Sequence, residues 1–291
     1  MSSLFLATCR AWPQLPENLL PLCQQLRQHG VKVIVSPWQD DKEADLVLPL
    51  CAWDYSESPE LFTQWLESLA ERGISTVNSV ALMQWNMRKH YLQDLAKWGV
   101  DVIPTEVLIH PKIEDLYALV KAKGWQNCVL KPAVGQSGKF VTRWNHLHEL
   151  LPFHVQEQFF VENHKVSSYQ GLIVQPYVPE IETLGESSMI FFQGKFSHAV
   201  KRQPAVGEWR ANSAYGVEVS SVRVSEIAIA TAHQVLRSLP EIPAYARVDG
   251  IDYGQRFLLN ELELIEPALY WHTASGASER FAQVLLSLIY R

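Results

Sequence analysis

The sequence predicts an α/β fold whose first part is built on a parallel sheet. Short apolar runs of strand length alternate with segments of helical periodicity, and glycines close several of the helical segments. Strands separated by helices favour parallel pairing, since each helix carries the chain back across the sheet. Two later pairs of strands are separated only by short turns, which favours antiparallel pairing there.

The first third of the chain shows the clearest alternation. The apolar spacing of Leu61, Phe62 and Trp65 marks one face of a helix that can begin at Pro59. Strands are expected at 4–8, 31–37, within 44–53 and at 74–78, with helices at 17–29 and from Pro59 to Gly73.

The remaining elements follow from the same rules. Helices are expected at 79–97, 111–123, 223–239 and from about Ser275, and strands at 100–109, 127–132, 171–178, 187–194, 195–203, 245–254 and 256–267. Gln193-Gly194 predicts a tight hairpin turn between two of these strands. The segment 133–144 reads as a glycine-containing hairpin or loop, and the stretch after it, through Lys165, shows no clear pattern.

Composition excludes several classes of partner. The chain has 291 residues, of which 47% are hydrophobic and 19% charged, as in an ordinary globular protein. A net charge of −6 leaves no broad basic field, so neither nucleic acid nor a membrane is expected as a partner. No apolar run approaches the ~20 residues that span a bilayer.

Cysteine usage and the start of the chain bear on the compartment. The four cysteines, Cys9, Cys23, Cys51 and Cys128, are far apart and form no CxxC pair, which is typical of buried thiols in a reducing compartment. The start, MSSLFLATCRAW, lacks the basic region of a signal peptide. We therefore expect a cytoplasmic protein.

The stretch LNELELIEP, residues 259–267, predicts a cation site. In a strand, Glu261 and Glu263 project to one face while the leucines between and after them project to the other. Asp249 lies in the preceding strand, which can bring it next to the glutamates. Three such carboxylates suit Mg²⁺, which prefers oxygen ligands. On these residues alone, a solvated polar face of the sheet remains an equal alternative.

Two other stretches could contact a nucleotide. Lys131 precedes a small loop, Gly135-Gln136-Ser137-Gly138-Lys139, whose backbone N–H groups and lysines could hold phosphate oxygens. It matches neither GxxxxGK[ST] nor GxGxxG, and such loops are more often plain hairpins. The stretch 175–178, Gln-Pro-Tyr-Val, could border an adenine ring, although a simple connection between lobes explains it as well.

Three histidines close together in the sequence could form a metal site. His146, His148 and His154 lie in the stretch without a clear pattern and have no matching partner motif, so we interpret them as surface histidines.

Taken in order, these motifs resemble the ATP-grasp superfamily over most of the chain. The resemblance is greatest to the glutathione-synthetase-like and ribosomal-protein-modifying ligase branch, and within it to relatives of the cyclo-ligase of cycloserine biosynthesis. It rests on WDY (53–55), NS (78–79), WNMRKHYLQDLAKWGVDVIPT (85–105), GESSMIFFQGKFSHAVKR (185–202) and ELELIEP (261–267). It implies an ATP-grasp fold with a Rossmann-like N-terminal lobe (1–88), a central lobe (89–170) and a C-terminal lobe (171–291).

The resemblance also implies roles for individual residues. Lys89 and Lys131 would contact ATP phosphates under the loop Gly135, Gln136, Ser137 and Gly138, while Gln175, Tyr177 and Val178 would border adenine, and Glu182 or Glu186 the ribose. Asp249, Glu261 and Glu263 would bind Mg²⁺, as one or two ions that Mn²⁺ could replace. Many family members carry Asn where Glu263 stands, so this site holds one more negative charge.

The implied reaction is an ATP-dependent ligation of a carboxylate to an amine, between two molecules or within one. An acyl phosphate would form on a small amino-acid-like substrate, with release of ADP and phosphate. Arg210 is the first candidate to stabilise the oxyanion, because RAN (210–212) resembles the family's Arg-Gly-Asn in a loop on the substrate side. Lys201 and Arg202, at the end of the strand 195–203, are the second candidates. A guanidinium fork matches carboxylate and phosphate geometry better than a lysine does. Substrate recognition is expected from Trp53, Asp54, Tyr55 and Asn212.

Two alternatives remain open at the level of sequence. One is a nucleotide-binding module without turnover, since a fold alone does not establish an activity. The other is a ligase that adds amino acids to the terminus of a protein or peptide. The resemblance also implies a homodimer formed through the first lobe.

Overall fold

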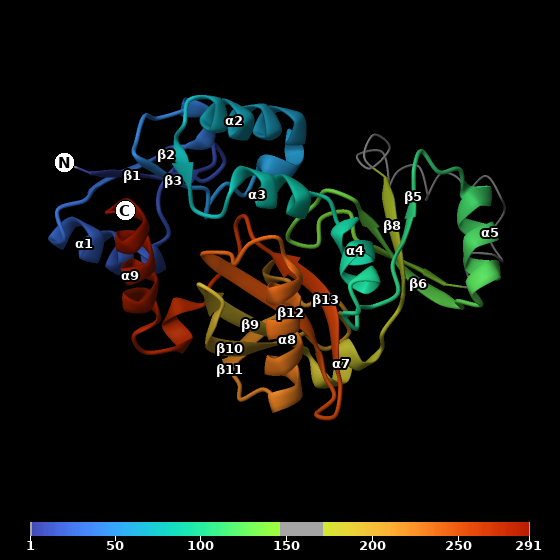
Figure 1. Ribbon diagram of the computed structural model, residues 1–291. Helices are drawn as coiled ribbons and strands as arrows, with labels where there is room; N and C mark the ends of the chain where they lie inside the picture. The colour runs from blue at the N-terminus through green and yellow to red at the C-terminus, as the bar shows by residue number, and fades with distance from the viewer. Residues whose placement is uncertain (1, 146–170, 291) are drawn as a thin grey trace.

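The computed structural model describes residues 2–145 and 171–290 as a mixed α/β protein with three sheets (Figure 1). The first sheet consists of β1 (Ser3–Thr8), β2 (Lys32–Pro37), β3 (Leu46–Leu48) and β4 (Ser75–Thr76). Its order is β2-β1-β3-β4 and all its pairs are parallel. The predicted parallel sheet is therefore confirmed.

Helices complete this first lobe. α1 (Leu20–Gln28) and α2 (Pro59–Glu71) are the crossover helices, and α2 begins at its proline as predicted. The face of α2 that carries Phe62, Trp65 and Leu66 is buried, as the helical spacing of these residues predicts. Short 3-10 turns lie at Glu17–Leu19, Trp38–Asp40 and Tyr55–Glu57.

The single helix predicted for 79–97 is wrong. The structure has two helices, α3 (Val80–Met87) and α4 (Tyr91–Lys97), because Arg88 adopts an extended conformation with φ −104° and ψ 123°. The break frees the backbone N–H of Lys89, which donates to the carbonyl oxygen of Ala133 at 2.8 Å. A continuous helix would have pointed Lys89 along the helix surface instead of into the centre of the molecule.

The second sheet is antiparallel and has the order β5-β8-β6-β7. Its strands are β5 (Glu106–Leu108), β6 (Asn127–Pro132), β7 (Thr142–Asn145) and β8 (Leu172–Pro176), and α5 (Ile113–Lys123) packs its apolar face on them. The predicted strand 100–109 is shorter than expected, because Pro104 has no N–H to donate and Ile103 pairs instead with Leu259 of the third sheet.

The third sheet is antiparallel and has the order β11-β10-β9-β12-β13. Its strands are β9 (Glu186–Phe192), β10 (Lys195–Gln203), β11 (Glu218–Ser221), β12 (Tyr245–Asp252) and β13 (Phe257–Glu263). α8 (Glu226–Ser238) and α4 share one core cluster with it. The hairpin between β9 and β10 is confirmed, with Gln193 and Gly194 both at positive φ. The remaining elements are α7 (Glu180–Leu184), α9 (Ala277–Ile289) and 3-10 turns at Ser213–Tyr215 and Trp271–Thr273.

The first and last segments of the chain share a core. α9 lies beside α1 (Figure 1), and Phe281 and Leu285 of α9 belong to the same buried cluster as Leu22 and Leu26 of α1. The predicted lobe boundaries after residues 88 and 170 stay predictions. All four cysteines are buried and free, as predicted. No helix among the described residues is long and apolar enough to cross a membrane.

Asn78, at the end of the first lobe, forms hydrogen bonds with the third sheet and the segments next to it. It has a positive φ of 62°, and its side-chain amide donates to the carbonyl oxygens of Tyr245 and Leu264, at 2.9 and 2.7 Å. Its side-chain oxygen accepts from the N–H of Ala244. These bonds fix the start of β12 and the end of β13 against the first lobe, and so position the polar residues described next.

Candidate active site

Most of the predicted site residues line one pocket between the sheets. The predicted residues that line it are Tyr55, Lys89, Lys131, Gly135, Gln136, Ser137, Gly138, Gln175, Tyr177, Val178, Glu186, Arg202, Arg210, Asn212, Glu261 and Glu263. They come from the second and third sheets, from the loops and helices next to them, and, for Tyr55, from a 3-10 turn of the first lobe. The fold therefore brings together residues that are up to about two hundred positions apart in the sequence.

The three predicted metal ligands form a cluster at this pocket: Glu261 and Glu263 line it, and Asp249 beside them is completely buried. Asp249 of β12 pairs with Glu261 of β13, and Glu263 lies two residues further along the same face. One oxygen of each lies within 4.8 Å of one oxygen of the other two. Leu262 and Leu264 point the other way and are buried, as predicted. The donor set is all carboxylate oxygen, which fits Mg²⁺.

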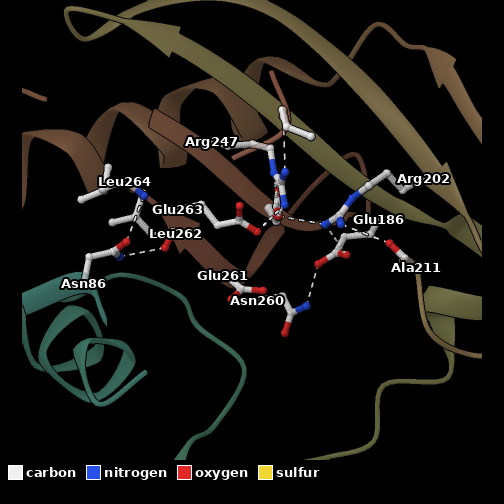
Figure 2. Close-up of polar contacts among 12 residues, drawn as sticks. Asn86, Glu186, Arg202, Ala211, Arg247, Asn260, Glu261, Leu262, Glu263 and Leu264 are labelled. Carbon is white, nitrogen blue, oxygen red and sulfur yellow. Dashed lines mark hydrogen bonds and ion pairs between the residues drawn. The ribbon is translucent and has the colours of Figure 1, made fainter. Parts of the chain in front are cut away.

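Two arginines form ion pairs with the carboxylates of this cluster and bridge them (Figure 2). Arg202 donates to Glu186 at 2.6 Å and to Asp249 at 2.8 Å. Arg247 donates to Asp249 at 2.9 Å and also to Glu263. Both guanidinium groups are almost completely buried. Each therefore compensates carboxylates that would otherwise repel one another in a poorly solvated place.

Arg247 is a site residue that the sequence analysis missed. It stands two positions before Asp249 on β12, so strand alternation places both on the same face. That spacing was visible in YARVDGID and could have identified it. Asn260 was missed too: it accepts from Lys131 at 2.9 Å and donates to Glu186 at 2.6 Å. Only the tertiary fold reveals that second contact.

The protonation of the cluster follows from this pairing. Burial works to raise the pKa of Asp249, but Arg202 and Arg247 outweigh it and hold that pKa below its usual range. Burial raises the pKa of Glu263 to about 7, since Arg247 only partly offsets it and Glu261 adds to it. Burial also opposes ionisation of Glu261, but Lys89 and Lys131 lower its pKa.

The two predicted phosphate lysines lie next to the carboxylates. Lys89 donates to Glu261 at 2.6 Å and to the carbonyl oxygen of Gly135 at 2.9 Å. Lys131 donates to Asn260, and burial lowers its pKa despite the nearby Glu261. The Lys131 ammonium has three donors, of which one contact is with Asn260, so it can still donate to an anion.

The loop 135–139 closes over the pocket. Ser137 and Gly138 both have positive φ, of 54° and 70°. A Cβ at Gly138 would lie 2.7 Å from Oδ1 of Asn212, so this position needs a glycine for space as well as for conformation. Gln136 carries a buried Oε1 that has no hydrogen-bond partner in the described part of the chain. An unpaired buried polar atom in a pocket wall is what a polar ligand would satisfy.

The strip predicted to border adenine is apolar on one side and polar on the other. Ile103, Val129, Val178 and Ile181 line the pocket beside Gln175, whose side-chain amide donates to Thr105 at 2.9 Å. Arg143 stacks 3.6 Å above the ring of Tyr177. This combination suits a flat heterocycle with hydrogen-bonding edges.

Besides the completely buried Asp249, four predicted site residues do not line the pocket. Lys201 is next to Arg202 on β10 and therefore projects from the opposite face of the strand, toward Gly185. Glu182 on α7 lies 3.8 Å from Arg143 in an ion pair. Asp54 accepts hydrogen bonds from the side chains of Trp38 and Gln39, and Trp53 packs edge-on against Trp12. The geometry does not support their predicted roles; WDY contributes only Tyr55.

Arg210, the first catalytic candidate, lines the pocket, but its guanidinium is already bound to Glu208 and stacked on Tyr215. Glu208 accepts from its Nε and Nη2 at 2.9 and 2.8 Å, and its guanidinium stacks 3.5 Å from the ring centre of Tyr215. The bonds to Arg210 lower the pKa of Glu208 to about 2. Arg202 and Arg247 are therefore better placed at the carboxylates. His146, His148 and His154 lie outside the described residues.

Comparison with known proteins decides the family. The family model described as "Prokaryotic glutathione synthetase, ATP-grasp domain" matches residues 94–253, more than half of the chain. The chain belongs to the ATP-grasp family. A second model, "D-cycloserine synthetase DcsG, N-terminal domain", matches residues 4–78. The ATP-grasp chain is thus an ATP-dependent ligase of the class that forms C–N bonds, as its curated relatives are.

Two relatives and two structures illustrate the likeness. The "Cycloserine biosynthesis protein DcsG" of Streptomyces lavendulae is 29% identical over 92% of this chain and 92% of its own length. A glutathione synthetase of Prochlorococcus marinus is 27% identical over 72% of this chain and 66% of its own length.

The crystal structure of D-cycloserine synthetase DcsG superposes with a TM-score of 0.83 at 23% identity, covering 99% of this chain and 100% of that one. A D-alanine–D-alanine ligase of Bacillus anthracis in complex with ATP superposes at 0.65 and 14% identity, covering 100% of this chain and 96% of that one. At these identities the structures establish the ATP-grasp fold.

Proposed function

We propose that this ATP-grasp ligase activates a substrate carboxylate as an acyl phosphate and passes the acyl group to an amine, with release of ADP and phosphate. The substrate is a small amino-acid-like molecule, and the amine belongs either to a second molecule or to the same one. The observation that carries the proposal is that Glu261 and Glu263, which cluster with the buried Asp249, line the same pocket as Lys89 and Lys131.

The carboxylate cluster, the lysines and the loop 135–139 would contact the phosphates of ATP, and an apolar strip would contact the base. Asp249, Glu261 and Glu263 would hold Mg²⁺, which would supply positive charge to the phosphate oxygens of ATP. Lys131 retains donors for those oxygens, and the loop 135–139 lies over the same place. The apolar strip from Ile103 to Ile181 receives the base. Positioning and charge neutralisation then supply most of the catalysis.

The arginines act on the developing charge. Transfer of the γ-phosphoryl group to the substrate carboxylate forms a C–O–P linkage and breaks the bond to the β-phosphate oxygen. Attack of the amine forms the C–N bond and expels phosphate. Arg202 is a lining residue of the pocket and shares Asp249 with Arg247. Nε of Arg202 has no hydrogen-bond partner among the described residues, so Arg202 keeps a donor for a phosphate or an oxyanion.

The test is an assay of products with a panel of amino acids and peptides. Purified protein is incubated with ATP and Mg²⁺, and ADP, AMP, phosphate and pyrophosphate are quantified. We expect ADP and phosphate in equal amounts, only with the correct carboxylate, and a loss of at least about a hundredfold for Lys131→Ala. The exposed Lys195→Ala variant serves as the matched control. AMP and pyrophosphate as products would contradict the acyl-phosphate route, and release of no product with any carboxylate would favour a nucleotide-binding module.

A further inference from the structure

Glu266 is a carboxylate in the pocket wall that the proposed chemistry leaves without a role. It lines the same pocket as the metal cluster but lies three residues beyond Glu263 and outside the group of oxygens that could share one ion. Within the described residues its carboxylate has no hydrogen bond and no ion pair. Asp249, Glu261 and Glu263 in contrast each have an arginine or lysine partner.

The backbone around Glu266 is held firmly. The side chain of Asn86 donates to the carbonyl oxygen of Leu262 at 2.8 Å and accepts from the N–H of Leu264 at 2.9 Å. Tyr245 donates its hydroxyl to the carbonyl oxygen of Ile265 at 2.5 Å. Both contacts to Leu262 and Leu264 are visible in Figure 2. The backbone that carries Glu266 is therefore held by the fold before any ligand binds.

Tyr55 presents a second open polar group beside it. Tyr55 is 5% exposed, packs its ring against Phe62 and belongs to the same buried cluster as Ile265, the residue before Glu266. Its hydroxyl has no hydrogen-bond partner within the described chain, and it lines the pocket. Among charged groups, Glu266 acts most strongly on Tyr55 and raises its pKa, after the effect of burial.

The charges around Glu266 determine which kind of ligand group can bind beside it and Tyr55. Burial raises the pKa of Glu266 well above its usual range, and the neighbouring Glu263 adds to this more than Lys89 offsets it. A further anion would raise this pKa still more, whereas a positively charged hydrogen-bond donor would favour the ionised form of Glu266 and could also donate to the Tyr55 hydroxyl. An ammonium or amine has this character.

The structure assigns Glu266, together with Tyr55, as the subsite that binds the amine of the substrate. The assignment rests on the proposed ligase function, because it places the amine beside the carboxylates that hold the phosphate-bound metal. It also names the substrate class: a small amino acid, whose free amine is required for binding.

The test measures binding without turnover. Thermal unfolding is followed at saturating Mg²⁺ and non-hydrolysable ATP analogue, with and without each of the proteinogenic amino acids in both enantiomers. Each compound that stabilises the protein is compared with its N-acetylated and deaminated counterparts. The variants are Glu266→Gln and Tyr55→Phe, with the exposed Glu71→Gln as a matched control.

We expect at least one amino acid to raise the melting temperature, its N-acetylated and deaminated counterparts to have no effect, and Glu266→Gln to weaken its binding by roughly tenfold or more. The stabilisation by nucleotide and Mg²⁺ should be unchanged in Glu266→Gln, which also shows that the variant is folded.

The assignment is overturned if no amino acid stabilises the wild type, if the counterparts without a free amine bind equally well, or if Glu266→Gln binds the amino acid normally. The response to nucleotide alone reports on the proposed function separately. A protein that ignores the nucleotide fails as an ATP-dependent ligase, whatever the amino acids do.

Discussion

A single arginine, Arg247, carries much of the charge balance of the site. It donates to Asp249 and Glu263 at once and is almost completely buried. Its removal would leave two buried carboxylates short of compensation, a loss that typically costs about 3–5 kcal/mol. We therefore expect Arg247→Met to lower the free energy of unfolding by several kcal/mol, and Mg²⁺ to recover part of it.

Denaturant unfolding with and without Mg²⁺ measures this effect. Arg237→Met, on the exposed side of α8, is the control and should change little. A variant of Arg247 that unfolds like the control would show that the carboxylates do not depend on this arginine.

At Gly138 a single methyl group should affect the loop. The built Cβ lies 2.7 Å from Oδ1 of Asn212, and φ is 70°. Gly138→Ala is therefore strained in the observed loop, by about 1 kcal/mol or more. We expect a higher KM for ATP in Gly138→Ala, measured in the product assay. Gly30→Ala has a similar φ of 77° but no atom near its Cβ, so unchanged ATP affinity is expected there.

Among the strands, β13 gives the clearest dependence on pH. The pKa of Glu263 is raised to about 7 from an ordinary value of 4.5, mainly by burial. A carboxyl whose pKa is raised in the fold stabilises it below the unfolded pKa and loses that contribution as the pH rises through the folded pKa. The metal-free protein should thus lose stability between about pH 5 and pH 8.

Melting temperatures over this range, without divalent ions, test the point. Glu263→Gln should show a smaller fall than the wild type, because it cannot ionise, and Mg²⁺ should remove the fall in the wild type. An equal fall in both proteins would assign the pH dependence to other groups, of which Glu266 is the first to examine.

Local sequence patterns predicted the helices and strands better than they predicted the residues of the candidate active site. Alternation along β13 was enough to place Glu261 and Glu263 on one face, and Gln193-Gly194 was enough to place a hairpin. The break between α3 and α4 could not be predicted from helical periodicity, because the contact that favours it joins Lys89 to Ala133, which follows the distant strand β6. Similarly, Trp53 and Asp54 read as substrate residues, but they pack and bond within the first lobe.

At the scale of the whole molecule, the chain ends hold the site together. Phe281 of α9 is fully buried and packs against Tyr245, whose hydroxyl in turn fixes Ile265. Phe281→Ala should cost about 3–5 kcal/mol of stability. It should also weaken nucleotide binding, although Phe281 does not line the pocket.

The comparison variant is Ile113→Ala in α5, which lies in a different buried cluster. Denaturant unfolding and nucleotide titration of both variants, at a temperature where each is folded, separate the two effects. Weaker nucleotide binding in the Ile113 variant alone would contradict the idea that α9 supports the site.

The most direct measurement is a thermal-shift titration with a non-hydrolysable ATP analogue, with and without Mg²⁺, on the wild type, Glu261→Gln and Lys131→Ala. A ligand at about 100 times its Kd stabilises the native state by roughly 2.7 kcal/mol, which raises the melting temperature measurably. We predict stabilisation that requires Mg²⁺ in the wild type and is lost in both variants. A nucleotide effect that is independent of Mg²⁺ and unchanged by either substitution would show that the pocket of Asp249, Glu261 and Glu263 is not where ATP binds.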